Sequence, residues 1–333
     1  MISIDPQTLR TRLDEILPTV QSPSRYLGLE RNLTRKPWDS TVLRVALAFP
    51  DAYEIGMSHQ GTRILYHLVN RRDDALAERT FAPMPDMARA LRAAEIPLYT
   101  LESYHSVGDF DVVGISLQSE LNYINVPYIL DLAGITRRAD ERSESEPLII
   151  GGGPCTANAE PVADFFDAIL IGDAEAALDT MLNAIRDGRA AGEDRTRLLH
   201  RLASIEGVYV PRFYTWVPAT SDRPGSWVEP EGVPFPVKRV WVDRLDLADQ
   251  PDVPIVPFAG VIQDRLGLEI MRGCTQGCRF CQAGYWYRPV REHDPAKVVE
   301  RVEKQIDETG FEEVGLLSLS TADYSQVEPL VYH

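Results

Sequence analysis

Residues 42–49 read VLRVALAF, a run of apolar side chains that is interrupted only by Arg44. Strands buried on both faces of a parallel sheet have such near-continuous apolar sequences, because helices cover both sides of the sheet. Segments with helical patterning separate this run from further ones of the same kind. The further runs are PLYTL (97–101), DVVGIS (111–116), PLIIGG (147–152) and DAILIG (167–172). This alternation predicts right-handed βαβ units in an open, doubly wound parallel sheet of the Rossmann type.

The helices that cover this sheet, and the limits of the domain, follow from the same pattern. The helical period is found at residues 60–71, 86–95, 174–187 and 195–204. We therefore expect an α/β domain over residues 41–205, preceded by a lead-in segment, 1–40, whose residues 5–17 are amphipathic.

The composition changes after residue 205. Short strand-like runs (GVYVP, FYTWV and VKRVWV) lie between Pro, Gly and Asp residues, and three prolines fall within residues 247–258. This pattern predicts a β-rich connector with a Pro-rich linker over residues 206–262. A second unit, 263–333, then begins with LGLEIMRGC (266–274), a helix is expected at 295–309, and EVGLLSLS (313–320) forms the next strand.

The bulk composition is that of an ordinary soluble globular protein. A length of 333 residues favours two domains. With 50 acidic and 34 basic residues, the net charge is −16, which gives nucleic acid no support as a partner. The sequence has no apolar run long enough to cross a membrane and no signal-peptide pattern, so we expect a cytoplasmic location.

The cysteines indicate a metal centre. Cys274, Cys278 and Cys281 lie in the stretch GCTQGCRFCQ (273–282), whereas Cys155 is distant. A structural zinc site requires four ligands, and His293 is the only imidazole near the cluster of cysteines. An iron–sulfur cubane held by three thiolates agrees better with the number of cysteines, because it leaves one iron open to an outside ligand. Cys155 is either a cofactor contact or a small buried residue.

The loop itself is suited to such a cluster. Glycine adopts backbone conformations that other residues avoid, so Gly273 and Gly277 are expected to bend the loop and turn three thiolates toward one face. We expect the ring of Phe280 to shield one side of the cluster.

The pattern C-x-x-x-C-x-aromatic-C of Cys274, Cys278, Phe280 and Cys281 resembles the hallmark of the radical S-adenosylmethionine (SAM) enzymes. This resemblance implies a 4Fe-4S cluster whose open iron binds SAM. It also implies an electron donor such as flavodoxin or ferredoxin, and reductive cleavage of SAM to a 5′-deoxyadenosyl radical. Phe280 would then also lie beside bound SAM.

The rest of the chain, roughly residues 25 to 330, resembles a branch of these enzymes that carries an N-terminal cobalamin-binding-like domain. Segments such as FPDAYEIGMSHQGTRILYHLVN and LIIGGGPCTANAEPVADFFDAILIGDAEAAL carry this resemblance. A glycine-rich turn at the carboxyl end of a strand is where doubly wound sheets place ligands. The residues expected to form the cobalamin-like pocket are Ser116, Glu120, Gly151, Gly152, Gly153 and Pro154.

One position departs from the cobalamin pattern. Domains that ligate cobalt through histidine carry D-x-H-x-x-G, but here Met57 and Thr62 replace the Asp and the Gly around His59. Without a carboxylate to orient its ring, His59 is better interpreted as a polar residue at a helix start. The sequence therefore does not decide whether the chain binds cobalamin for methyl transfer or for a related radical modification.

The second unit resembles the first two strand–helix units of a radical SAM (β/α) barrel, and complete barrels are much longer. We therefore expect the chain to be the N-terminal part of a longer enzyme and to be inactive alone. Ser318 and Ser320 fall where related enzymes contact the amino group of SAM. The alternative function is a non-catalytic ligand-sensing module with a structural metal at the cysteines. The sequence does not indicate a substrate.

Overall fold

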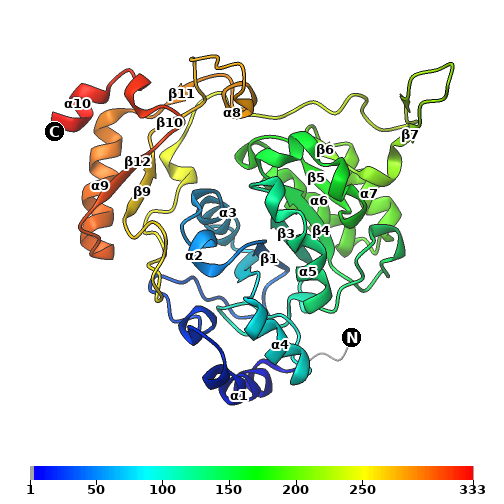
Figure 1. Ribbon diagram of the computed structural model, residues 1–333, viewed down its shortest axis with the longest axis horizontal. Coiled ribbons are helices and arrows are strands. Elements are labelled where there is room, and N and C mark those ends of the chain that lie inside the picture. Colours follow the sequence, from blue (N-terminus) through cyan, green and yellow to red (C-terminus); the bar gives the residue numbers. More distant parts are fainter. Residues whose placement is uncertain (1–3, 333) are drawn as a thin grey trace.

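The computed structural model describes residues 4–332, and a six-stranded sheet with the order β2-β1-β3-β4-β5-β6 forms its centre. Its strands are β1 (Leu43–Phe49), β2 (Ala75–Phe81), β3 (Val112–Ser116), β4 (Leu148–Gly152), β5 (Ala168–Leu170) and β6 (Val208–Tyr209). The first five strands are parallel and β6 is antiparallel (Figure 1). The strand order reverses between β1 and β3, and ligands of such sheets bind outside the carboxyl ends of the strands at this switch point.

Helices cover both faces of the sheet, as the apolar run of β1 predicts. Val45 and Leu47 belong to one core, which also contains residues of α3, α6 and α7. Ala46 and Ala48 point to the other face and share a second core with α5. The helices are α1 (Pro6–Ile16), α2 (Tyr53–Gly56), α3 (Gln60–Asn70), α4 (Pro85–Ala93), α5 (Asn125–Leu132), α6 (Leu178–Ala190) and α7 (Arg195–Ala203). The doubly wound α/β fold is thereby confirmed.

The position of the second strand differs from the prediction. The strand is β2, with the sequence ALAERTF, whereas residues 97–101 contribute only an isolated bridge between Tyr99 and Ser106. β2 escapes sequence reasoning because Glu78, Arg79 and Thr80 interrupt its apolar pattern. All three are buried, and tertiary partners satisfy their side chains. Tertiary context therefore overrides local pattern at this edge of the sheet.

The segment after residue 205 also differs from the prediction. GVYVP belongs to the sheet, because β6 pairs with β5. FYTWV forms β7 (Thr215–Val217), as expected, but its partner β8 (Ser226–Val228) was not predicted. VKRVWV makes only a single bridge, between Val240 and Gly172. Strands and bridges as short as these form only against a neighbouring strand. Their own sequences therefore contain little that predicts them.

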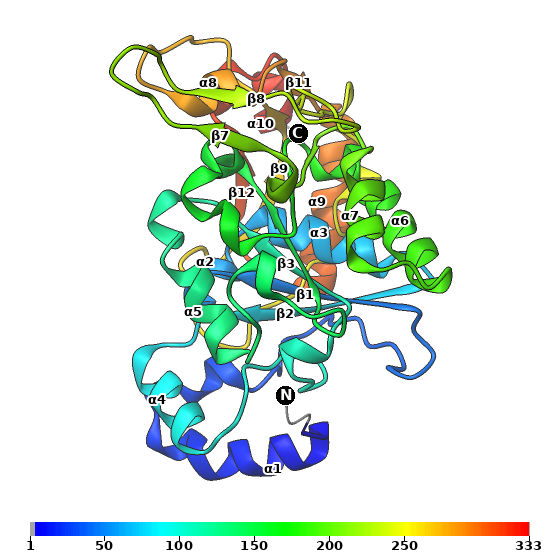
Figure 2. The same cartoon turned by 90° about the vertical axis from the view of Figure 1, so that its right-hand side faces the viewer.

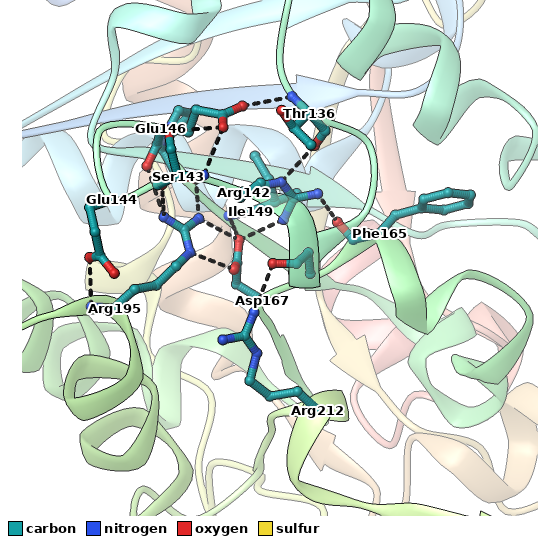
Figure 3. Close-up of polar contacts among 12 residues, drawn as sticks. Thr136, Arg142, Ser143, Glu144, Glu146, Ile149, Phe165, Asp167, Arg195 and Arg212 are labelled. Carbon is teal, nitrogen blue, oxygen red and sulfur yellow. Dashed lines mark hydrogen bonds and ion pairs between the residues drawn. The ribbon is translucent and has the colours of Figure 1, made fainter.

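A buried ion cluster anchors β5 beside β4 (Figure 3). Asp167, which directly precedes β5, accepts hydrogen bonds from Arg142 Nη1 at 2.7 Å and from Arg195 Nη2 at 3.0 Å. The same carboxylate accepts the backbone N–H of Ile149 in β4 at 2.8 Å. Two guanidinium groups and one amide thus satisfy this buried carboxylate, as the desolvation of a charge requires.

The second unit contains one strand–helix–strand unit. β9 (Leu266–Glu269) and β12 (Val314–Leu317) are parallel and are joined by α9 (Pro295–Thr309), whose bounds match the prediction. The other elements are β10 (Met271–Arg272), α8 (Gln282–Trp286), β11 (Arg291–Glu292) and α10 (Val327–Tyr332). β9 contacts α3 of the first unit. Figures 1 and 2 place α1 and α8 at opposite ends of the molecule.

No helix within residues 4–332 combines the length and the apolar character that crossing a bilayer requires.

Candidate cofactor and cluster site

A cavity of about 800 Å³ lies between the sheet and the second unit. Its floor is apolar and comes from β1, β3 and β4, with side chains such as Val45, Leu47 and Ile150. Its walls come from α3 and α6, from the loops that follow β3, β4 and β5, and from the cysteine loop with the end of β12. The volume falls within the range of about 300–1,000 Å³ that is typical of small-molecule and cofactor sites.

The glycine-rich turn after β4 forms one lip of the cavity, and Gly151, Gly152, Gly153 and Pro154 all line it. Gly153 has φ +112°, and a Cβ there would lie 2.8 Å from the backbone oxygen of Leu117. A Cβ on Gly152 would meet no atom within 4 Å, so this position opens onto empty space. The turn therefore lets a ligand approach the backbone closely.

The loop after β3 forms the next part of the lip. Ser116 ends β3 and Glu120 begins a short 3-10 helix; both line the cavity. His59, at the start of α3, lines it too, and its two ring nitrogens are engaged. Nδ1 accepts the N–H of Thr62 at 3.1 Å, and Nε2 lies 3.0 Å from Oε1 of Gln118. Burial lowers the pKa of His59 to about 4, so the ring is neutral at neutral pH and caps the helix.

Cys155 follows the turn and is buried, with 6% of its surface exposed. Burial, together with the carboxylate of Glu120, raises the pKa of its thiol to about 11. Cys155 therefore stays protonated at neutral pH, although it also lines the cavity.

The cysteine loop lies across the cavity from the sheet. Gly273 and Gly277 have φ values of +96° and +64°, which is the left-handed bend expected of them. The N–H of Cys281 donates to the backbone oxygen of Cys278 at 3.1 Å. Cys281 and Phe280 line the large cavity. Phe280 is 92% exposed.

The three thiols are not gathered around one point. Cys274 lines a separate open hollow of about 510 Å³, whereas Cys281 lines the large cavity. Within residues 4–332, no group of three or more His, Cys, Asp or Glu side chains is placed to hold a metal ion. His293 is buried, and its Nε2 lies 3.1 Å from the Gln250 amide. The described residues therefore form no zinc site with His293.

The two serines of the second unit differ in position. Ser318 lines the cavity, and its hydroxyl lies 2.8 Å from that of Thr321. Ser320 is not among the residues that line the cavity; it precedes a 3-10 turn, where its hydroxyl interacts with Asp323.

Two family matches cover most of this architecture. Residues 61–211 match the family described as radical SAM proteins, N-terminal, and residues 268–332 match the radical SAM superfamily. The chain belongs to the radical SAM superfamily.

Individual relatives match parts of the chain. An uncharacterized protein of Methanocaldococcus jannaschii is 25% identical over 292 residues, which are 87% of this chain and 52% of that protein. The anaerobic magnesium-protoporphyrin IX monomethyl ester cyclase of Cereibacter sphaeroides is 35% identical over 74 residues, or 21% of this chain and 11% of the cyclase.

A solved structure shares the fold. The radical SAM methyltransferase TsrM of Kitasatospora setae, with cobalamin and a 4Fe-4S cluster bound, has a TM-score of 0.53 and 14% identity. The match covers 87% of this chain and 51% of that of TsrM. TsrM with tryptophan and a SAM analogue bound gives a TM-score of 0.50 at 13% identity. The chain spans about half the length of the relatives it matches.

A radical SAM protein uses a 4Fe-4S cluster and SAM, and the residues present fit this requirement in their chemistry. Three thiols lie within one exposed loop, at the spacing of the superfamily hallmark. The N–H of Gln276 donates to Cys274 Sγ at 3.5 Å. The family match supports the expected enzyme and not its alternative, a non-catalytic module with a structural metal.

Sequence reasoning missed the charged cluster beneath the cysteine loop of this radical SAM protein. Asp173, just after β5, is buried and pairs with Arg291. Arg272 directly precedes the loop; its guanidinium lies 2.8 Å from carboxylate oxygens of both Glu175 and Glu269. The sequence feature that could have indicated this cluster is Asp173 itself, an acidic residue at the carboxyl end of a predicted parallel strand. This cluster connects the first unit to the base of the cysteine loop.

Proposed function

We propose that this chain carries the cofactor sites of a radical SAM enzyme that cleaves SAM reductively and uses cobalamin for methyl transfer or a related radical modification. One observation carries the proposal: the glycine-rich turn of the sheet domain and the cysteine loop line the same cavity. Two cofactors held on these two sides would face each other across one cavity.

The cluster would be held by Cys274, Cys278 and Cys281, and when bound with SAM it supplies the electron that generates a carbon radical. The chain's own residues prepare the surroundings. The floor of the cavity, formed by β1, β3 and β4, is apolar, and an apolar wall beside a radical offers no polar group for side reactions. Cys155 stays a neutral thiol, and the ring of His59 is held by Thr62 and Gln118.

Cobalamin would lie against the turn of Gly151, Gly152, Gly153 and Pro154, with Ser116 and Glu120 at its edge. The absence of a side chain at Gly152 leaves room for a bulky ring system. Ser318 would contribute to the SAM site at the opposite lip. A flavodoxin or ferredoxin in the cytoplasm would deliver the electron to the exposed cysteine loop.

The proposal is tested by metal content. We expect the full chain, reconstituted with iron and sulfide without oxygen, to bind about four irons. Replacing Cys274, Cys278 or Cys281 by Ala should abolish iron retention, because a cubane with two protein thiolates loses its chelate support. Cys155→Ala is the matched control and should keep its iron. Full iron content in Cys278→Ala would refute the assignment.

A further inference from the structure

A small polar hollow of about 150 Å³ lies away from the cofactor cavity, between α3, the lead-in segment and the Pro-rich linker. Residues of α3 form one wall, Asn32 and Thr34 form another, and the linker closes the third side. Its volume corresponds to about five water molecules at about 30 Å³ each. The residues that line it are Asn32, Thr34, Arg63, Tyr66, His67, Asn70, Arg71, Pro251, Val253 and Ile255.

The charge of this hollow has one sign. Arg63, His67 and Arg71 follow one another at intervals of four residues, so they lie along one ridge of α3. None of the lining residues is acidic. Such a lining stands out in a chain whose net charge is −16.

Arg63 is the residue whose charge is not balanced. It is 8% exposed; its Nε and Nη2 both donate to the backbone oxygen of Met57, at 3.2 and 2.8 Å. Among the described residues no carboxylate forms an ion pair with it, and Nη1 has no protein acceptor. The charge that acts on its pKa is that of Arg79, which has the same sign. Burial lowers the pKa of Arg63 to about 10, so the group is still a cation at neutral pH.

The charged groups that neighbour Arg63 already have partners of their own. Arg71 pairs with Asp249 at 2.9 Å and with Asp179 at 3.7 Å. Asp252, which acts on His67 through its charge, pairs with Arg301 and Lys304 at 3.0 and 3.3 Å. His67 Nε2 lies 3.1 Å from the backbone oxygen of Ala248. A buried cation without a partner is unfavourable, and these groups do not supply the partner.

We propose that this hollow binds a small oxyanion, such as inorganic phosphate or a carboxylate, with Arg63 as its charge partner. A guanidinium presents a planar fork of donors that suits both anions. The site is separate from the cofactor cavity, so the inference does not depend on the proposed function. Because α3, the lead-in segment and the linker meet at the hollow, the bound anion would connect them and hold the linker against α3.

The test is the binding of inorganic phosphate to the full chain, measured by calorimetry and by thermal unfolding, with chloride at equal ionic strength as the reference. We expect phosphate, and more weakly acetate, to raise the melting temperature above that in chloride, because a ligand of the native state stabilises it. Arg63→Gln should weaken phosphate binding by at least about tenfold, since a charged hydrogen-bond partner is lost. Arg71→Gln is the matched control on the same ridge; its charge is already paired, so its effect should be much smaller.

A second variant keeps the test valid if Arg63→Gln fails to fold. Thr34→Asp places a carboxylate in the hollow beside Arg63. It should raise the melting temperature in chloride and remove the response to phosphate. Equal effects of phosphate and chloride on the wild type, or equal weakening in Arg63→Gln and Arg71→Gln, would overturn the proposal. A response to acetate that equals the response to phosphate would identify a carboxylate site.

Discussion

Two carboxyl groups, those of Glu78 and Glu102, lie buried close together beside β2. Glu102 accepts from Arg79 Nε at 2.6 Å, whereas Glu78 has no cationic donor among the described residues and accepts from the hydroxyls of Thr100 and Ser103, at 2.5 and 2.6 Å. Burial, and then the charge of Glu102, raise the pKa of Glu78 to about 7 from its ordinary value of 4.5. Glu78 is therefore about half protonated in the native state at pH 7 and largely protonated below it.

This shift predicts a pH-dependent effect of Glu78→Gln. A carboxyl group with a raised native pKa contributes stability that is complete below 4.5 and is lost as the pH rises through about 7. The amide keeps the acceptor oxygen and cannot ionise. The variant should thus gain in free energy of unfolding relative to the wild type between about pH 5 and about pH 8. Urea unfolding at both pH values measures this, with the exposed Glu312→Gln as control. An unchanged difference at the two pH values would show that Glu78 is not buried as a neutral acid.

His59 has a predicted role as a helix cap and not as a cobalt ligand. Cob(II)alamin bound to the chain should therefore show no nitrogen superhyperfine splitting in its electron paramagnetic resonance spectrum. His59→Ala should leave that spectrum unchanged but lower the free energy of unfolding by about 1 kcal/mol, as loss of an N-cap does. His59→Asn restores an N-cap acceptor and should recover most of this loss. Splitting that disappears in His59→Ala would assign the histidine to cobalt.

At the scale of the element, the turn after β4 shows how two adjacent glycines have different tasks. Gly153 needs its positive φ and its close approach to Leu117, so it determines the path of the chain. Gly152 has no such constraint, and its missing side chain leaves space in the cavity. A side chain at Gly153 would therefore affect the stability of the fold, whereas a side chain at Gly152 would affect ligand binding.

The two positions give a matched pair of substitutions. Gly153→Ala should lower the free energy of unfolding by about 1–3 kcal/mol, because the new Cβ meets the backbone in a strained conformation. Gly152→Ala should leave stability nearly unchanged but weaken cobalamin binding, because its methyl group enters the cavity. Urea unfolding and cobalamin absorption titrations measure the two effects. Equal losses of stability in both variants would contradict this division of roles.

At the scale of the whole molecule, the two units meet through charged groups. Asp173 pairs with Arg291, accepts the N–H of Val242 at 3.3 Å and lies 3.6 Å from Arg272. The partner segments are the connector and both strands that flank the cysteine loop, β10 and β11. One carboxylate at the edge of the sheet therefore positions the base of that loop.

Removing this charge should loosen the connection between the units. Asp173→Asn leaves Arg291 buried without a counter-ion, which typically costs about 3–5 kcal/mol. We expect a lower free energy of unfolding and faster tryptic cleavage after the exposed Arg244 in the connector. Asp187→Asn is the control, because its pair with Arg186 lies on the surface, where a salt bridge contributes about 0–1 kcal/mol. If Asp173→Asn and Asp187→Asn unfold alike, the cluster does not hold the units together.

The sequence by itself determined the parts whose physics is local. β1, β3, β4 and β5 are apolar runs because both of their faces are covered, and this is visible in the residues alone. The bounds of α9 follow from a capping Asp294 and from Gly310, whose φ is +75°. The spacing of Cys274, Cys278 and Cys281 resembles the hallmark of the superfamily, and this is visible in the sequence because all three cysteines lie in one short segment.

Only the tertiary structure decided what depends on partners distant in the sequence. β2 is a strand because Glu102 and Thr100 satisfy its charged side chains. The shared cavity exists because the cysteine loop returns to the sheet edge, where Asp173 holds the strands that flank it. The unpaired charge of Arg63 appears only once the linker and the lead-in segment close around α3. Charge pairing and enclosure arise from contacts between segments, so no local pattern encodes them.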